Sequence, residues 1–236
     1  MPPKVRHPAE SCAQCSHRTL RLFCNLSENA SHRLDEIGVQ VALPSRAVVF
    51  RESQPSNGVF VVCEGLLKLS AASRDGRVMI LRLAGAGDLL GLSAALNGLR
   101  YEVTAETLEP TILKSVRRDD FMEFLHNYVE VGEKTSQVLA KEYREVFLDA
   151  RRLALSGSAS GRLARLLLDW AATANCGKPE LRFTMALTHE ELANMAGTAR
   201  ETVTRLLNQF ERDGVITRHG ATLVILSPGE LEQLSG

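Results

Sequence analysis

Hydrophobic and polar residues alternate in three different ways along the chain, and each way predicts a different kind of structure. Over residues 43–116, short apolar runs rich in β-branched residues are separated by turn-forming sequences such as Pro44-Ser45 and Asp75-Gly76. Closely spaced short strands of this kind favour an antiparallel sandwich or barrel, with Asp-Gly at a hairpin. A helical stretch is expected to lead into it at residues 31–39.

The second pattern is helical and covers residues 119–155. One apolar stripe has alternating spacings of four and three residues, the repeat of a coiled coil, and a second stripe lies on another face. We expect the second stripe to pack on the β-domain and the first to pair with another copy, along one helix of about 50 Å from Asp120 to Leu153. A helix buried on both sides in a monomer is the alternative. The expected dimer contacts are Leu139, Tyr143, Val146, Ala150 and Leu153, after weak positions at Gly132 and Ser136. The second stripe comprises Phe121, Phe124, Tyr128, Val131 and Val138.

A run of small residues, Ser156-Gly-Ser-Ala-Ser-Gly161, interrupts the helical pattern and is expected to act as a hinge. A further helix follows at residues 162–172. A turn at residues 177–179 and a short strand around residues 181–185 come next. The apolar face of the helix is formed by Leu163, Leu166, Leu167 and Trp170.

The segment from residue 187 to residue 216 predicts two helices joined by a tight turn. Thr188 followed by Glu191 is a capping box that starts the first helix, and Thr198 with Glu201 is expected to start the second in the same way. Gly197 lies where the sharp turn of a helix-turn-helix favours a residue without a Cβ. The following hairpin, with its turn at His219-Gly220, predicts a wing. The inward-facing residues are expected to be Leu192, Met195 and Ala196 in the first helix and Val203, Leu206, Leu207 and Phe210 in the second.

The polar face of the second helix carries the candidate chemistry. Its side chains suit base edges, because Arg can contact guanine O6 and N7 together and Glu can accept from cytosine N4. A solvated helix face is the alternative interpretation. Thr188, Thr198 and His219 are further candidate DNA contacts. The face is formed by Arg200, Glu201, Thr204, Arg205 and Asn208.

Composition narrows the class of protein. The chain has 236 residues, 28 Lys and Arg against 28 Asp and Glu, and 44% hydrophobic residues, which fits a globular protein and excludes disorder. No apolar run is long enough to span a membrane and the N-terminus lacks a signal-peptide pattern, so a cytoplasmic protein is expected. No nucleophile elbow, P-loop or zinc-protease motif indicates an enzyme. Residues 151–236 contain ten basic and nine acidic residues, so nonspecific attraction to DNA is expected to be modest.

The whole chain resembles the Crp/Fnr superfamily of bacterial transcription regulators. The sequence Arg200-Glu-Thr-Val-Thr-Arg205 is similar to the recognition-helix signature R-E-T-V-x-R of the Crp branch, which reads a TGTGA-type half-site. The resemblance implies an α+β fold with an N-terminal arm and β-roll (residues 1–120), a dimerisation helix (121–155) and a winged helix-turn-helix (156–236). It also implies that Arg200 and Arg205 contact guanines and that Glu201 contacts the base opposite one of them. Double-stranded DNA, a second copy and RNA polymerase would be the partners, and the protein would act as an activator.

The resemblance makes cyclic AMP the first ligand to consider for the β-roll. In cyclic-nucleotide-binding members, a Glu takes the ribose hydroxyl and an Arg pairs with the phosphate. Here Leu92 replaces the Glu and Glu102 falls where the Arg is expected, with Arg100 two residues away. A carboxylate facing a phosphate is unfavourable, so the sequence argues against cyclic AMP.

The N-terminal cysteines offer another sensing group. Cys12, Cys15 and Cys24 resemble the N-terminal cysteines of the oxygen sensor Fnr, whose thiolates ligate a [4Fe–4S] cluster. The gap before the third cysteine is longer than usual, and the expected fourth cysteine near the end of the β-roll is missing. A zinc site with His7 or His17, or unligated thiols among which Cys12 and Cys15 form a redox-sensitive pair, are the alternatives. No histidine lies in a recognisable haem motif.

These elements suggest an allosteric mechanism. A signal reaching the β-roll or the cysteines would alter the pairing of the long helices. The hinge at residues 156–161 would then reorient the two recognition helices to the spacing of one DNA turn, ~34 Å.

Overall fold

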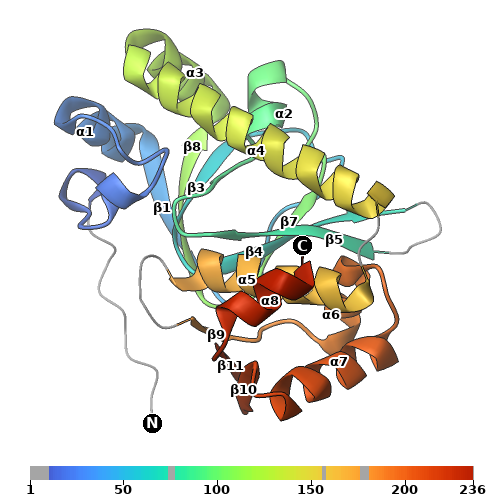
Figure 1. Cartoon of the computed structure of the whole chain (residues 1–236). Helices are drawn as coiled ribbons and strands as arrows, with labels where there is room; N and C mark the ends of the chain where they lie inside the picture. The colour runs from blue at the N-terminus through green and yellow to red at the C-terminus, as the bar shows by residue number, and fades with distance from the viewer. Residues whose placement is uncertain (1–10, 74–77, 156–157, 176–180, 236) are drawn as a thin grey trace.

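The computed structural model describes residues 11–73, 78–155, 158–175 and 181–235, without the side chains of residues 148–155 and 174–175. Figure 1 shows an N-terminal β-rich domain, the long helix α4 lying across it, and a C-terminal domain of helices with a small sheet. The expected α+β fold is therefore confirmed. The predicted turns at residues 75–76 and 177–179, and part of the predicted hinge, lie outside the described residues.

The N-terminal domain is a β-roll of two four-stranded antiparallel sheets. The first has the strand order β1-β8-β3-β6 and the second the order β2-β7-β4-β5. Apolar side chains from both sheets fill the space between them, and Phe50, Phe60 and Tyr101 form a stack of rings within it. The strands are β1 (Gly38–Leu43), β2 (Val48–Phe50), β3 (Gly58–Glu64), β4 (Leu66–Ala72), β5 (Val78–Gly85), β6 (Leu89–Leu90), β7 (Thr104–Thr107) and β8 (Thr111–Arg117).

Short helices close the ends of the roll. The helix expected at residues 31–39 is present as α1 (Glu28–Ile37), which begins at the N-cap Ser27 and leads into β1. The N-terminal arm contains two 3₁₀ helices, η1 (Cys12–Gln14) and η2 (Arg18–Leu20). The short helix α2 (Leu92–Asn97) follows β6 and packs on the same core.

The predicted single long helix is wrong in one respect, because the chain forms two helices. These are α3 (Arg118–Asn127) and α4 (Val129–Leu155), and Tyr128 between them leaves the helical conformation with φ −125° and ψ 100°. The break lets both helices direct their apolar residues into one core, where the ring of Tyr128 lies 5.1 Å from that of Phe124. At 1.5 Å per residue α4 is therefore about 40 Å long.

The two apolar stripes of this region have different surroundings, as predicted for the second of them. Phe121, Phe124, Val131 and Val138 of the second stripe are buried in the core that α3 and α4 share with α1 and the β-roll. Along the heptad stripe, by contrast, Tyr143 is 74% exposed and Val146 is 68% exposed. Leu139 is partly buried, and the side chains of Ala150 and Leu153 lie outside the described residues.

The described residues of the C-terminal domain pack four helices and a three-stranded sheet around one core. The apolar face predicted for residues 162–172 is buried at Leu163, Leu167 and Trp170, whereas Leu166 is only partly buried. The sheet has the order β10-β11-β9 and forms the predicted wing. The elements are α5 (Ala159–Asn175), β9 (Arg182–Thr184), α6 (His189–Ala196), α7 (Arg200–Arg212), β10 (Ile216–His219), β11 (Thr222–Ile225) and α8 (Pro228–Ser235).

Candidate DNA-binding interface

The first helix of the candidate helix-turn-helix starts as the sequence predicts. The Thr188 hydroxyl accepts from the Glu191 backbone N–H at 3.2 Å, and the Glu191 carboxylate accepts from the Thr188 N–H at 2.9 Å. This reciprocal capping box satisfies two backbone donors that would otherwise be unpaired at the helix start. At the other end of α6, Gly197 has φ +58°, a left-handed conformation that glycine adopts without steric cost. The capping box and the glycine turn are thus both confirmed.

The second predicted capping box is wrong. Helix α7 begins at Arg200, so its N-cap is Ala199, which offers no side-chain oxygen, and Thr198 lies one residue too early to cap. The backbone N–H of Thr198 instead donates to the Ala193 carbonyl at 3.0 Å, as part of the turn. Glu201 is therefore not held by a cap, and its exposed carboxylate lies in the first turn of α7.

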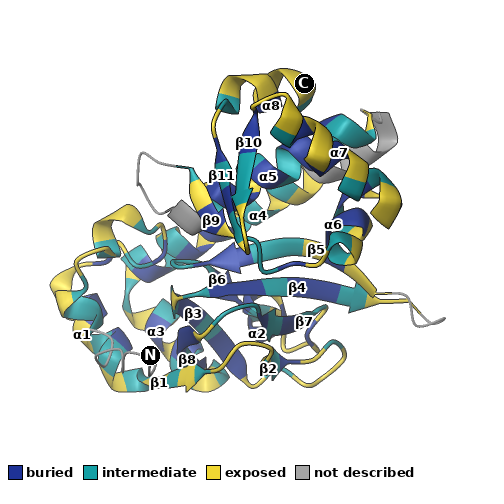
Figure 2. Ribbon diagram, turned by 90° about the horizontal axis from the view of Figure 1, so that it is seen from below, coloured by how far each residue is buried: buried dark blue, intermediate teal, exposed yellow. Residues whose placement is uncertain are grey.

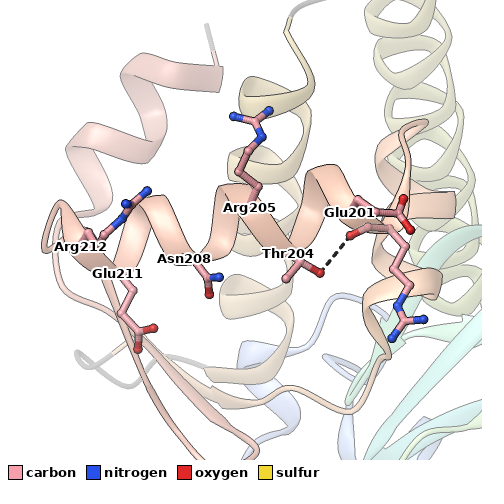
Figure 3. A pocket seen from close by; sticks show the side chains of 7 residues that line it. Glu201, Thr204, Arg205, Asn208, Glu211 and Arg212 are labelled. Carbon is pink, nitrogen blue, oxygen red and sulfur yellow. Dashed lines mark hydrogen bonds between the residues drawn. The ribbon is translucent and has the colours of Figure 1, made fainter.

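Helix α7 presents one apolar and one polar face. Val203, Leu206, Leu207 and Phe210 are at most 5% exposed, so the predicted inward stripe is confirmed. The polar side lines a shallow hollow of about 860 Å³, and Figure 3 shows its side chains projecting from the exposed side of the helix. A solvent-facing surface of basic, acidic and amide groups of this kind suits base edges in a major groove. The hollow is lined by Arg200, Glu201, Thr204, Arg205, Asn208, Glu211 and Arg212.

Thr204 differs from its neighbours because the fold already uses its hydroxyl. The hydroxyl donates to the Arg200 carbonyl at 3.0 Å and lies 2.9 Å from Nδ1 of His189 on α6. Burial lowers the pKa of His189, and the nearby Arg218 and Arg200 lower it further, so a neutral imidazole is favoured. His189 and Thr204 therefore hold the two helices together.

The wing is fastened to α7 by Arg218. This β10 residue places its guanidinium 2.6 Å from Glu211 Oε2 and donates to Asn208 Oδ1 at 2.7 Å. The hydrogen bond from Arg218 holds the pKa of Glu211 below its usual value. The amide oxygen of Asn208 therefore already accepts one hydrogen bond from the wing.

A second arginine, Arg162 of α5, supports the turn. Its Nε donates to the Ala196 carbonyl at 2.6 Å and its Nη2 donates to the Gly197 carbonyl at 3.2 Å. These carbonyls end α6, where a cation is favoured by the helix dipole. Sequence reasoning missed both Arg162 and Arg218, since neither lies in the recognition-helix motif.

The other predicted contacts lie around this surface. Thr188 at the start of α6 is exposed, Thr198 in the turn is partly buried, and His219 at the tip of the wing is exposed. His219 and Thr222 form the last pair of the hairpin, and Gly220 in its turn has φ +61°. The structure thus brings Arg200, Glu201 and Arg205 together on α7.

The β-roll segment that corresponds to a nucleotide cassette has its own internal partners. Leu92 begins α2 and is only 2% exposed, because it belongs to the hydrophobic core. Glu102 is exposed and accepts a hydrogen bond of 2.8 Å from the Ser93 hydroxyl. The Arg100 guanidinium donates to the Ser53 carbonyl at 2.7 Å. These contacts place the Glu102 carboxylate beside the start of α2.

The cysteines of the N-terminal arm gather at the β-roll, and Cys63 of β3 joins them. The thiols of Cys12, Cys24 and Cys63 interact electrostatically with one another, and that of Cys15 interacts with those of Cys24 and Cys63. Burial raises the pKa of Cys12 to about 11 and that of Cys24 to about 12. Sequence reasoning placed Cys63 only in an apolar strand and missed this proximity.

Two cations lie beside these thiols. Nη1 of Arg21 is 4.0 Å from the Cys15 Sγ, and its Nε is buried without a hydrogen-bond partner. Lys114 of β8 contacts both the Cys12 thiol and the Asp35 carboxylate. Among the residues that the structure describes, no three His, Cys, Asp or Glu side chains are grouped closely enough to hold a single metal ion. Across those same residues, none of the helices is both long and apolar enough to cross a membrane.

Two family models match the two halves of this architecture. A model described as a cyclic nucleotide-binding domain matches residues 40–128, and one described as a Crp-like helix-turn-helix domain matches residues 161–234. The chain belongs to the Crp/Fnr family of transcription regulators. It is thus a DNA-binding regulator, and the named relatives of this Crp/Fnr protein are regulators rather than enzymes.

Individual relatives agree with this assignment. The chain is 28% identical to the transcriptional activator protein Anr of Pseudomonas aeruginosa, over 99% of this chain and 96% of that protein. It is 29% identical to a CRP-like cAMP-activated global transcriptional regulator of Mycobacterium tuberculosis, over 78% of this chain and 83% of that one. Among solved structures, FixK2 from Bradyrhizobium japonicum matches the fold with a TM-score of 0.73 and 22% identity, covering 85% of this chain and 98% of FixK2.

Proposed function

We propose that this Crp/Fnr-family regulator is a homodimer that reads a palindrome of TGTGA-like half-sites through α7. The observation that carries the proposal is the placement of Arg200, Glu201 and Arg205 on the exposed side of the first two turns of α7. The N-terminal turns of a recognition helix are the part that contacts base edges. Two arginines suit two guanines and one carboxylate suits a cytosine amino group, which is the composition of such a half-site.

The exposed stripe of α4 supports the dimer. Large apolar side chains such as those of Tyr143, Val146 and Phe147 are more than half exposed in a single chain, and the rings of Tyr143 and Phe147 stack with centroids 6.4 Å apart. Because a parallel coiled coil would bury these positions on both copies, a second copy is the occupant we propose. The opposite stripe is already buried in the β-roll core, so it is unavailable for this purpose.

DNA reading is tested by fluorescence anisotropy with a TGTGA-N6-TCACA duplex and with duplexes altered at one guanine. Arg200→Ala should cost about 1–3 kcal/mol on the intact site and should relax the preference at one base pair. Arg212→Ala, on the same helix but near its C-terminus, is the matched control and should affect all duplexes alike. An equal loss on every duplex for Arg200→Ala would mean that Arg200 contacts only phosphate, and the proposed half-site would be wrong.

A second candidate function, regulation by oxygen or redox state through an iron–sulfur cluster, is favoured by the gathered thiols. Cys63 of β3 adds a fourth thiol to the group, although the family's fourth cysteine is expected near the end of the β-roll, and Arg21 and Lys114 provide positive charge beside these thiols. Cluster ligands are thiolates, so binding would have to reverse the effect of burial that raises the pKa of the Cys12 and Cys24 thiols, and it would have to draw the thiols closer together than they lie in the described residues. When bound, a cluster would supply the oxygen-sensitive chemistry, while these residues would hold it.

This candidate is tested on anaerobically purified protein by absorbance and by iron and sulfide analysis. Cys176, the fifth cysteine of the sequence, serves as the control. A broad band near 400 nm that is lost in Cys63→Ser but kept in Cys176→Ser would support a cluster with Cys63 as a ligand. A sharp Soret band would indicate haem instead. Colourless protein that contains neither iron nor zinc would contradict the candidate and favour unligated thiols.

We infer that the β-roll does not use cyclic AMP, because Leu92 is buried and the Glu102 carboxylate lies beside Ser93 at the start of α2. Isothermal titration with cyclic AMP should show no binding.

We further propose that the DNA-bound dimer contacts RNA polymerase as an activator, in line with the name of the Pseudomonas relative. Run-off transcription from a promoter carrying the site tests this, and a fall in transcript on adding the protein would indicate a repressor.

A further inference from the structure

The sensor domain and the DNA-binding domain share one hydrophobic core. Leu66 of β4 and Ile80 of β5 are each 4% exposed, and they belong to the same buried cluster as Trp170, Leu192 and Leu207 of the C-terminal domain. In Figures 1 and 2 the β4–β5 hairpin lies directly against the side of the C-terminal domain that carries α5 and α6. The position of the C-terminal domain is therefore set in part by a packed interface with the sensor sheet.

The two faces of strand β4 pack on different domains. Side chains alternate between the two faces of a strand. Leu67 and Leu69 face the interior of the β-roll, where they pack with Phe50 and Tyr101. Leu66 and Lys68 face the other way, toward the C-terminal domain. On an uncovered sheet this second face would be the solvated one, and Lys68 fits that pattern, yet only 16% of its side chain is exposed.

Lys68 is the charged centre of the interface. Its Nζ lies 2.7 Å from Glu191 Oε1 on α6 and 3.4 Å from Glu106 Oε1 on the neighbouring strand β7. The other oxygen of Glu191 accepts from the backbone N–H of Thr188 at 2.9 Å. Burial opposes the ionisation of Glu191, but the hydrogen bonds from Lys68 and Thr188 outweigh it and the pKa of this carboxyl lies below its usual value. The Glu191 carboxylate thus caps the N-terminus of α6 and also binds this helix to strand β4 of the sensor domain.

The interface leaves the DNA-reading surface uncovered. It uses α5 and α6, whereas Arg200, Glu201 and Arg205 of α7 remain exposed. A contact that holds α6 and leaves α7 accessible is suited to orienting α7.

We propose that Lys68 is a positioning residue for DNA recognition, which holds α6 through Glu191 and so fixes α7 relative to the sensor domain. Because the turn at Gly197 rigidly joins α6 to α7, an orientation imposed on α6 is passed to the recognition helix. In a dimer, the same contact in both copies sets the distance between the two recognition helices. This inference rests on the proposed dimeric reading of a palindrome.

The test compares duplexes whose half-sites differ only in spacing. The affinities of the full-length protein for TGTGA-N6-TCACA and TGTGA-N8-TCACA are measured by anisotropy at fixed salt. Lys68→Met keeps the aliphatic stem and removes the charge, so it should weaken binding to the N6 duplex by about 5-fold or more, the lower range of measured site-to-site couplings. It should also bring the N6-to-N8 affinity ratio closer to one, since a loosely held domain tolerates other spacings. A loss of folding alone would lower the active fraction and leave that ratio unchanged.

Two variants isolate the contact between domains. Lys68→Arg keeps a cation within reach of Glu191 and should retain the spacing preference. Glu106→Gln removes only the partner of Lys68 within the β-roll and should behave like the unaltered protein. An unchanged N6-to-N8 ratio in Lys68→Met, or an equal loss in Glu106→Gln, would overturn the proposal.

Small-angle X-ray scattering without DNA separates this proposal from the choice of half-site. Lys68→Met should increase the radius of gyration of the dimer, because the C-terminal domain is released from the sheet, while Glu106→Gln should not. Unchanged scattering in Lys68→Met would overturn the positioning role. If the unaltered protein binds neither duplex, the proposed half-site fails, and scattering still decides whether Lys68 holds the domain.

Discussion

Arg162 offers the sharpest test of how the helix-turn-helix is held, because its guanidinium binds the backbone carbonyls at the end of α6. We predict that Arg162→Met destabilises the domain by removing the two donors that end α6. The Ala196 carbonyl would lose a bond of 2.6 Å and the Gly197 carbonyl a bond of 3.2 Å. Met fills a similar volume along the stem, so the variant tests the hydrogen bonds rather than the packing.

The magnitude follows from the burial of the two carbonyl-bearing residues. Ala196 is 0% exposed, so its carbonyl has little access to water, and hydrogen bonds from a charged group contribute about 1.5–3 kcal/mol. Gly197 is exposed, so water can replace the lost donor there at little cost. We therefore expect a loss of about 2 kcal/mol, which corresponds to a decrease in Tm of roughly 4–8 °C in a chain of this length.

Arg165→Met is the matched control. Arg165 lies one turn along the same helix and pairs with Asp169 at 2.9 Å on the surface, and such pairs contribute about 0.3–0.5 kcal/mol. Differential scanning calorimetry and anisotropy should show a lower Tm and weaker specific binding for Arg162→Met than for Arg165→Met. If the two variants have the same Tm, the hydrogen bonds of Arg162 do not stabilise the turn and the prediction is wrong.

Three further predictions concern other parts of the molecule. Replacing Gly132 and Ser136 together by Leu should strengthen the N-terminal half of the α4 heptad stripe and give DNA binding that no longer depends on a signal. Gel shifts under oxidising and reducing conditions would test this, and DNA binding that still differs between the two conditions as in the unaltered protein would contradict it. Gly85→Val should weaken the interface between domains, because even the first side-chain carbon would lie 2.6 Å from a side-chain carbon of α5, and scattering should then show a larger dimer. Because Arg218 lowers the pKa of Glu211, their contact should be fully stabilising above the usual carboxyl value of 4.5 and be lost as pH falls through the lower folded value. The hydrogen-exchange protection factors of the wing, which are corrected for the intrinsic pH dependence of amide exchange, should therefore fall in acid, and Arg218→Met should remove that dependence.

Local pattern was sufficient for much of the fold. The capping box at Thr188, the left-handed glycine at 197 and the buried stripe of α7 each depend on residues within a few positions of one another, and all three are present. The second capping box was wrong because a shift of one residue in the helix start makes Ala199 the N-cap. The break at Tyr128 was missed because the apolar spacing continues across it and only the shared core explains the turn.

The remaining features depend on residues far apart in the chain. Cys63 is separated from the N-terminal cysteines by about 40 to 50 residues, and only the folding of the arm onto β3 brings their thiols together. Arg162 reaches a turn 34 residues away, and Lys68 meets a carboxylate 123 residues away. A single sequence gives no signal for such pairs, since each residue alone has the character of an ordinary surface cation.

Because the two faces of β4 pack on different domains, the sensor domain and the DNA-binding domain cannot be exchanged independently between relatives. A chimera that joins this sensor to a relative's reader at residues 156–161 would keep Leu66, Lys68 and Ile80 facing a surface they were not matched to. In such a chimera both domains should fold, but a signal in the sensor domain should not be transmitted to the DNA-binding domain. A chimera that also replaces these three positions of the recipient's sensor sheet with the residues found here should transmit a signal better than one joined at the linker alone.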